Sequence, residues 1–374
     1  MGLSGARKIS EEATPQGGIN HGLSVYLDLV RVSAAVIVMI AHAEVSHLIL
    51  PLPLVLDLAP VSVIVFFVLS GYIIESTTRR NAGYKVYVAH RVARIYSVAL
   101  PAVILSFVCA GGIALANGHN ATQLFVSGWG QWWRLPIVLM FQGEDWFSAV
   151  EVPWNGPFWS LHYEVADYII FGILQFLRGR MRLVTALAFF LIVGPKILLL
   201  FPCWWIGVEL ARRPSIQFPS QHWAGLAFIL APIAIVVLAR ARVAFDVQRK
   251  ILSIFPKFYL FDHSQPFITH YAIAVLVAAS FAAARQLNWL SSVQTGRYGA
   301  TIRWLSGYTF SLYLYHRPLQ SLASQFYRVK DGEVLIPLFT QFAIVGIIVL
   351  IGFFTERRTK MWRIFVTRHL TRLP

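Results

Sequence analysis

Long apolar runs separated by short clusters of charge constrain this chain more than any other feature. Of its 374 residues, 57% are hydrophobic and only 13% are charged, and the mean hydropathy is +0.62. Soluble domains carry about 25% charged residues, and a soluble protein of this size could not bury so much apolar surface. The sequence therefore predicts an all-α, polytopic helix bundle within a lipid bilayer.

Ten apolar segments are candidates for membrane-spanning helices, since a span needs roughly 20 residues and fewer where protein covers part of the helix. They are residues 24–49, 60–77, 88–116, 158–177, 183–195, 197–211, 222–239, 266–284, 304–325 and 334–354. Gly194 and Pro195 divide the region 183–211, although Pro195 could equally kink one long helix. We expect a polar cytoplasmic tail over 1–22, a transmembrane domain over 23–356 and a basic cytoplasmic tail over 357–374.

The charge is strongly basic, with 32 Lys and Arg against 17 Asp and Glu and a formal net charge of +15. Nucleic-acid binding needs a basic soluble face, and the hydropathy argues against one. With ten helices and the N-terminus inside, 21 of the 32 basic residues fall in inside segments, as the positive-inside rule requires. The distribution of charge therefore predicts that both termini are cytoplasmic, and the hydropathy predicts that nucleic acid is not a partner.

Two predicted outer loops stand out. The loop 240–265 carries five basic residues against the positive-inside trend. It is either an interfacial loop with snorkelling side chains or a docking surface for an anionic or carbohydrate-bearing substrate. The loop 117–157 is rich in tryptophan, which is typical of a bilayer interface unless the loop folds over a site.

Ionisable residues within spanning helices are costly and therefore mark functional sites. The first predicted helix carries Asp28, Arg31 and His42. At 100° per residue these three fall within an arc of about 60°, and His42 lies about 21 Å along the helix axis from Asp28. Asp28 and Arg31 could form a structural i,i+3 pair. His42 could be a buried core histidine, but an imidazole facing a bundle interior favours a general base or nucleophile.

Arg91 and Arg94 lie on one helix face at a predicted cytoplasmic boundary. Positive-inside anchoring explains such a pair. The functional alternative is a phosphate clamp, because guanidinium groups bind phosphate oxygens in a bidentate manner.

Five elements of the sequence occur in an order that resembles the acyltransferase-3 family of integral-membrane O-acyltransferases. They are Asp28-x2-Arg31 with His42, 66–72 (FFVLSGY), Arg91-x2-Arg94-Ile95-Tyr96, 159–164 (WSLHYE) and 306–316 (SGYTFSLYLYH). The resemblance covers about residues 23–356. Ser97 stands where the family commonly has proline, a departure that leaves the ionisable residues unchanged.

The resemblance implies a ten-helix enzyme that moves an acyl group, usually acetyl, from cytoplasmic acyl-CoA to a hydroxyl of a cell-surface or lipid-linked glycan. His42 matches the catalytic histidine, and Asp28 and Arg31 match its partners. Arg91 and Arg94 match the pair that binds the CoA phosphates. Glu164 and His316 match further functional positions.

The mechanism that follows has CoA docked on Arg91 and Arg94, with His42 as base or transient acyl carrier. We expect no metal. The expected partners are the bilayer, acyl-CoA (acetyl-CoA in the usual case), the acceptor and glycan-biosynthesis proteins, and the expected location is a bacterial inner membrane.

One alternative of a different class uses the same ionisable residues. A proton-coupled secondary transporter could use a relay of Asp28, Arg31, His42, Glu164, Asp167 and Glu209. Transporters often contain repeated halves with broken helices at matching positions, and the sequence has no such pairing. Release of thiol from acyl-CoA would distinguish an enzyme from a transporter.

Overall fold

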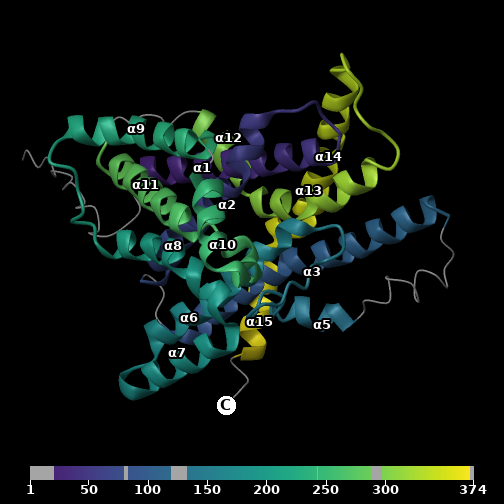
Figure 1. Ribbon diagram of the computed structural model, residues 1–374. Coiled ribbons are helices and arrows are strands. Elements are labelled where there is room, and N and C mark those ends of the chain that lie inside the picture. The colour runs from purple at the N-terminus through teal and green to yellow at the C-terminus, as the bar shows by residue number, and fades with distance from the viewer. Residues whose placement is uncertain (1–20, 80–82, 119–132, 242, 288–296, 371–374) are drawn as a thin grey trace, which may run out of the picture.

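The computed structural model describes residues 21–79, 83–118, 133–241, 243–287 and 297–370, and every regular element in these ranges is a helix (Figure 1). The longer helices are α1 (His21–Val45), α2 (Pro53–Thr78), α3 (Tyr84–Ala116), α6 (Trp159–Phe176), α8 (Pro195–Arg212), α9 (Gln221–Arg240), α11 (Phe267–Gln286) and α14 (Leu335–Phe354). The shorter ones are α5 (Arg134–Leu139), η2 (Gly156–Phe158), α7 (Gly179–Val193), α10 (Val243–Ile254), η3 (Pro256–Ser264), α12 (Arg297–Ser306), α13 (Thr309–Ala323), η5 (Glu356–Arg358) and α15 (Thr359–Leu370). Nearly all of the predicted N-terminal tail, 1–22, lies outside the described residues.

Six stretches of the described chain are long and apolar enough to cross a membrane. They are Gly22–Val45, Pro53–Thr78, Tyr84–Ala116, Gln221–Arg240, Pro256–Gln286 and Leu335–His369. The four other predicted spans are helical but are not among these six, and they correspond to α6, α7, α8 and the α12–α13 region. The chain is therefore an all-α, multi-pass membrane protein.

Helix breaks at Gly194 and at Gly307–Tyr308 determine how the apolar segments 183–211 and 304–325 are divided. Gly194 has φ 79°, which favours glycine, and it ends α7 directly before Pro195 begins α8, so 183–211 is two helices. The prediction of one helix over 304–325 is wrong, because Gly307 and Tyr308 separate α12 from α13. The Glu356 carboxylate accepts the backbone N–H groups of Phe310 (3.4 Å) and Ser311 (2.8 Å), which satisfies the new helix start.

Helices α2 and α8 pack backbone to backbone at the centre of the bundle. A Cβ atom on Gly71 would overlap the carbonyl oxygen of Trp204, and one on Gly207 would overlap that of Val68. Small residues allow such close approach of helices in membranes. This contact fixes the helix that carries Ser70 and the neighbouring helices α1 and α11, which also pack against α2.

Apolar side chains remain exposed on the outer helices, as lipid contact requires. Examples are Leu226, Ile229, Ile233 and Val237 on α9 and Leu335, Phe339, Phe342 and Leu350 on α14.

Two segments expected to be a tail and a loop contain helices. Within the predicted C-terminal tail, α15 packs along α3, where the hydroxyls of Ser97 and Thr359 lie 3.2 Å apart (Figure 1). The predicted loop 240–265 holds α10 and η3.

Candidate active site

His42 on α1 and His316 on α13 form a pair inside the bundle. Nδ1 of His42 lies 3.3 Å from Nε2 of His316, and the ring centroids are 5.1 Å apart. His316 is fully buried, whereas His42 is half-buried. Each Nδ1 also lies 2.8 Å from a backbone carbonyl one helical turn earlier, that of Val38 for His42 and that of Leu312 for His316.

These contacts determine which ring nitrogen carries the proton in each neutral histidine. A carbonyl oxygen only accepts, so each Nδ1 is a donor. Nε2 of His316 is then an acceptor that faces the Nδ1–H of His42. The lone pair on Nε2 of His42 has no hydrogen bond within the part of the chain that the structure describes. His42 therefore presents a free basic and nucleophilic nitrogen, held in orientation by His316.

His42 lines a cavity of about 260 Å³. The cavity wall comes from α1, α2, the segment before α6, η3 and α13. Its polar and aromatic members are His42, Glu151, Trp159, His263 and Tyr313. The tryptophan-rich loop and the basic loop therefore both contribute to this cavity, through Glu151 and His263 respectively. Two of the tryptophans of the loop 117–157, Trp129 and Trp132, lie outside the described residues.

A second, smaller cavity of about 70 Å³ is lined by three arginines, Arg31 from α1 and Arg91 and Arg94 from α3. Arg94 is exposed, and the Nε atoms of Arg31 and Arg91 are buried without a hydrogen-bond partner among the described residues. Buried donors in proteins are normally paired. Unpaired guanidinium donors on a cavity wall can therefore bind the oxygens of an anionic ligand.

Glu164 on α6 provides the negative charge in this arginine-lined cavity. Its Oε1 accepts hydrogen bonds from the hydroxyl of Tyr168 and from Ser70 Oγ (2.9 Å). The Arg91 guanidinium lies over the Tyr168 ring, 5.6 Å from its centroid. Glu164 therefore organises the polar wall of this cavity and has no direct contact with the histidine pair.

Tyr313 and Val63 line both cavities and form the partition between them. The Tyr313 hydroxyl lies 2.8 Å from Ser160 Oγ and 3.2 Å from the carbonyl oxygen of Pro157, and its ring centroid is 6.4 Å from that of His316. A ligand that occupies both cavities must pass this tyrosine.

The seven residues singled out in the sequence thus fall into two groups. Arg31, Arg91, Arg94 and Glu164 line the smaller cavity, whereas His42 and His316 form the pair beside the larger one. Asp28 lines neither cavity; its Oδ1 pairs with Arg31 Nη1 at 3.3 Å and so helps to hold that guanidinium.

Sequence reasoning missed Tyr168, Tyr313, Glu151 and His263 as members of these cavity walls. Tyr168 follows Glu164 by four residues, so helical spacing could have found it. Tyr313 precedes His316 by three residues on α13, so the same spacing could have found it. Glu151 and His263 join the wall only through packing between distant segments.

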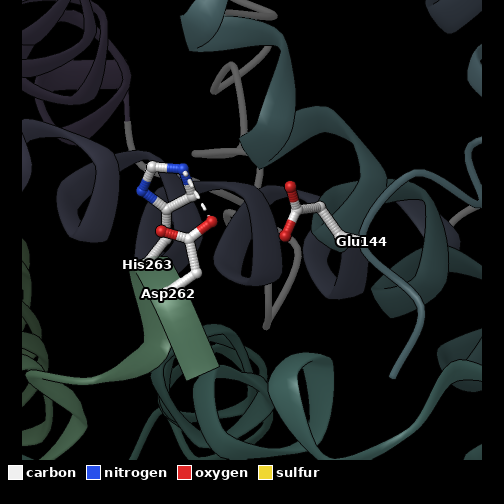
Figure 2. Close-up of side chains that lie close together, drawn as sticks. All are labelled: Glu144, Asp262 and His263. Carbon is white, nitrogen blue, oxygen red and sulfur yellow. Dashed lines mark ion pairs between the residues drawn. The ribbon is translucent and has the colours of Figure 1, made fainter. Parts of the chain in front are cut away.

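A charged cluster lies behind His263. Figure 2 shows Glu144, Asp262 and His263 close together, and His263 Nε2 lies 3.8 Å from Asp262 Oδ2. One ligand atom from each of the three residues lies within 4.8 Å of the others, so the group could hold a metal ion. However, the ammonium of fully buried Lys196 forms an ion pair with Glu144 and donates to the carbonyl oxygen of Ser148 (2.7 Å).

Burial raises the pKa of Glu144 to about 7, and the contact with Lys196 partly opposes this rise. Lys196 already supplies the positive charge that a cation would bring to this cluster. That the protein works without a metal stays a prediction.

Comparison with known proteins assigns the family. The acyltransferase domain model of the acyltransferase 3 family matches residues 24–356 of the chain. Searches of curated proteins and of solved structures gave no match. The family match covers both cavities and all seven residues predicted from the sequence. The chain therefore belongs to the acyltransferase 3 family of membrane O-acyltransferases.

Proposed function

We propose that this enzyme transfers an acyl group, acetyl in the simplest case, from cytoplasmic acyl-CoA to a hydroxyl of a cell-surface or lipid-linked glycan. The observation that carries the proposal is the pair of adjoining cavities, one lined by arginines and one by His42, with Tyr313 between them. An acyltransferase needs both a donor site and a basic or nucleophilic centre next to it.

Arg31, Arg91 and Arg94 form the donor site in this proposal. The Nε–H donors of Arg31 and Arg91, which have no partner among the described residues, and the exposed guanidinium of Arg94 match the phosphates of CoA. A cavity of about 70 Å³ has room for a phosphate or the tip of the pantetheine arm but not for a nucleotide, so the adenosine lies outside the bundle. The pantetheine arm then brings the thioester past Tyr313 to His42.

His42 carries the chemistry through Nε2. This nitrogen either takes the proton of the acceptor hydroxyl or accepts the acyl group from sulfur before passing it on. In both cases His316 acts as the orienting partner, because it accepts the Nδ1–H of His42 and leaves Nε2 free. Glu164 and Asp28 keep the arginines in place, through Tyr168 and through Arg31 respectively.

The two cavities suit a donor and an acceptor on opposite sides of the membrane. Arg31 and His42 are eleven residues apart on α1, which is about 16 Å along the helix. With ten spans and both termini in the cytoplasm, the arginines are at the cytoplasmic side and His42 is deeper in the bundle. The location that fits is a bacterial inner membrane, where glycan-biosynthesis proteins would supply the acceptor.

The transporter alternative receives little support from the ionisable residues. Its relay includes Glu209, which pairs with Arg212 (3.5 Å), the last residue of its own helix, and with Arg213 (3.0 Å), the next residue. Glu209 lines neither of the two cavities described above. A carboxylate that is held in ion pairs and lies outside both cavities is poorly placed to pass protons to the ionisable residues of the cavity walls.

The proposal is tested by two measurements. Proteoliposomes that contain the purified enzyme should release free thiol from acetyl-CoA, whereas empty liposomes should not. Mass spectrometry of cell-envelope glycans, with and without the gene, should show the loss of O-linked acyl groups when the gene is removed. Transport of a solute without thiol release, and unchanged glycans, would contradict the proposal.

A further inference from the structure

We infer that the acceptor binds to the wall of the larger cavity formed by Glu151, Trp159 and His263, and that His263 takes the proton of the acceptor hydroxyl. The inference rests on the proposed acyl transfer through His42. It assigns a function to the segment 240–265 through a histidine, His263, that lines the cavity.

None of the basic side chains that the structure describes in this segment lines the cavity. Arg240 pairs with Asp57 (2.8 Å) and Arg249 pairs with Asp246 (2.7 Å). Among the described residues of the segment, the one that lines the cavity is His263, near the end of η3. The segment therefore delivers an imidazole to the site that holds His42.

His263 is held firmly in this position. Its ring stacks on Trp159, with the centroids 4.0 Å apart and the planes at 10°. The next residue, Ser264, is fully buried, where its Oγ donates to the carbonyl oxygen of Lys196 (2.8 Å) and lies 3.0 Å from the Tyr163 hydroxyl.

Asp262 supports the base function of His263. Its carboxylate lies on the Nε2 side of the imidazole (Figure 2), at 3.8 Å, and stabilises the positive charge that arises when His263 takes a proton. Asp262 also has φ 46° and ψ −119°. Such backbone conformations are costly for residues other than glycine and occur mainly at functional sites.

The other bases near the cavity are already committed. His316 binds Leu312 through Nδ1 and His42 through Nε2, so neither nitrogen is available. Nε2 of His42 cannot serve as a base while it carries the acyl group. His263 and Glu151 are the remaining bases of the cavity wall, and of the two it is His263 that forms an ion pair with Asp262 when it is protonated (3.8 Å).

The wall also matches the chemistry of a sugar. The ring system of Trp159 offers an apolar surface, and Glu151 and His263 offer hydrogen-bond partners for hydroxyl groups. A cavity of about 260 Å³ is close to the lower end of the size of small-molecule sites. It therefore fits a single sugar unit at the end of a glycan.

The acceptor oxygen attacks the carbonyl carbon of the acyl group on Nε2 of His42 and forms the ester C–O bond. The C–N bond to His42 breaks, and its electron pair returns to Nε2. The hydroxyl proton passes to Nδ1 of His263, which later releases it to water.

The test separates the two half-reactions. Purified enzyme in proteoliposomes is mixed with acetyl-CoA in the absence of acceptor, and the burst of released thiol is measured. The same variants are expressed in cells that lack the gene, and the ester content of the envelope glycans is measured by mass spectrometry. The variants are His263→Gln, His263→Phe (which keeps an aromatic ring against Trp159), His42→Gln, Glu151→Gln and, as an exposed control, His222→Gln.

We expect both His263 variants to keep a burst of one thiol per enzyme and to lower the glycan ester content at least tenfold, because general-base catalysis typically contributes 10²–10⁴-fold. Glu151→Gln should keep the burst, which needs no acceptor, and should lower the ester content less than the His263 variants do, because the amide still forms hydrogen bonds. His222→Gln should retain both activities. Wild-type ester content in the His263 variants, or loss of their burst, would overturn the inference. A normal burst and ester content in His42→Gln would instead refute the proposed function.

Discussion

Nε2 of His316 accepts the Nδ1–H of His42 at 3.3 Å, although 274 residues separate the two histidines in the chain. The contact joins α13 to α1 and leaves Nε2 of His42 as the free nitrogen. Orientation of a catalytic imidazole by a second hydrogen-bonding group is a general requirement of base and nucleophilic catalysis. The pair therefore links the packing of the bundle directly to the chemistry.

Replacing His316 with phenylalanine should lower kcat for acyl transfer about 10- to 100-fold, because His42 loses the acceptor that fixes its tautomer. The KM for acetyl-CoA should change little, since His316 lines neither cavity. Steady-state thiol release measures both quantities. His316→Gln keeps a polar group at this position and should retain more activity; equal losses in the two variants would argue for a packing role alone.

Replacing Arg94 with glutamine should raise the KM for acetyl-CoA about tenfold, as expected for the loss of a charge-assisted hydrogen bond to phosphate. Acetyl-pantetheine lacks the nucleotide phosphates, so the variant and the wild type should turn it over equally. Arg249→Gln, on an exposed and distant helix, is the matched control. A similar loss with both donors would show that Arg94 does not act through phosphate.

Gly71→Ala should destabilise the protein by about 1–3 kcal/mol or more, because the added methyl group overlaps the backbone of α8. Gly225→Ala is the matched control, since a Cβ at Gly225 in α9 meets nothing within 4 Å. Thermal unfolding in detergent should show a lower midpoint for Gly71→Ala only. Equal midpoints would contradict the close packing of α2 against α8.

Asp145 provides a test of pH dependence outside the helices. Burial raises its pKa from 3.8 to about 6, so the folded protein retains this proton to higher pH than the unfolded chain does. Deprotonation between about pH 4 and pH 6 therefore favours unfolding. Asp145→Asn should stabilise the protein at pH 8 by up to about 3 kcal/mol and have little effect at pH 4. An equal effect at both pH values would contradict this assignment.

Hydropathy was sufficient to predict the all-α fold and the helical state of all ten apolar segments. It could not predict the division of 304–325 into α12 and α13, because that break depends on a carboxylate, Glu356, from a distant part of the chain. Helical periodicity correctly predicted that Arg31 and His42 face the interior of the bundle. It did not reveal that they line different cavities, since the partition comes from Tyr313 on another helix.

The contribution of His263 was the hardest to foresee. The only sequence signal in its segment, 240–265, was an excess of Lys and Arg in a predicted outer loop. His263, which lines the cavity, is not one of those five basic residues. Its position follows from contacts of η3 with α6 and α8, which no local pattern encodes.

The central claim is that the acyl group passes from acyl-CoA through a reaction at Nε2 of His42. The most direct test is the rate of thiol release from saturating acetyl-CoA by His42→Gln in proteoliposomes, with His222→Gln measured alongside. The account predicts a rate at least 100-fold below wild type for His42→Gln and an unchanged rate for His222→Gln. Thiol release at the wild-type rate from a correctly folded His42→Gln enzyme would contradict it.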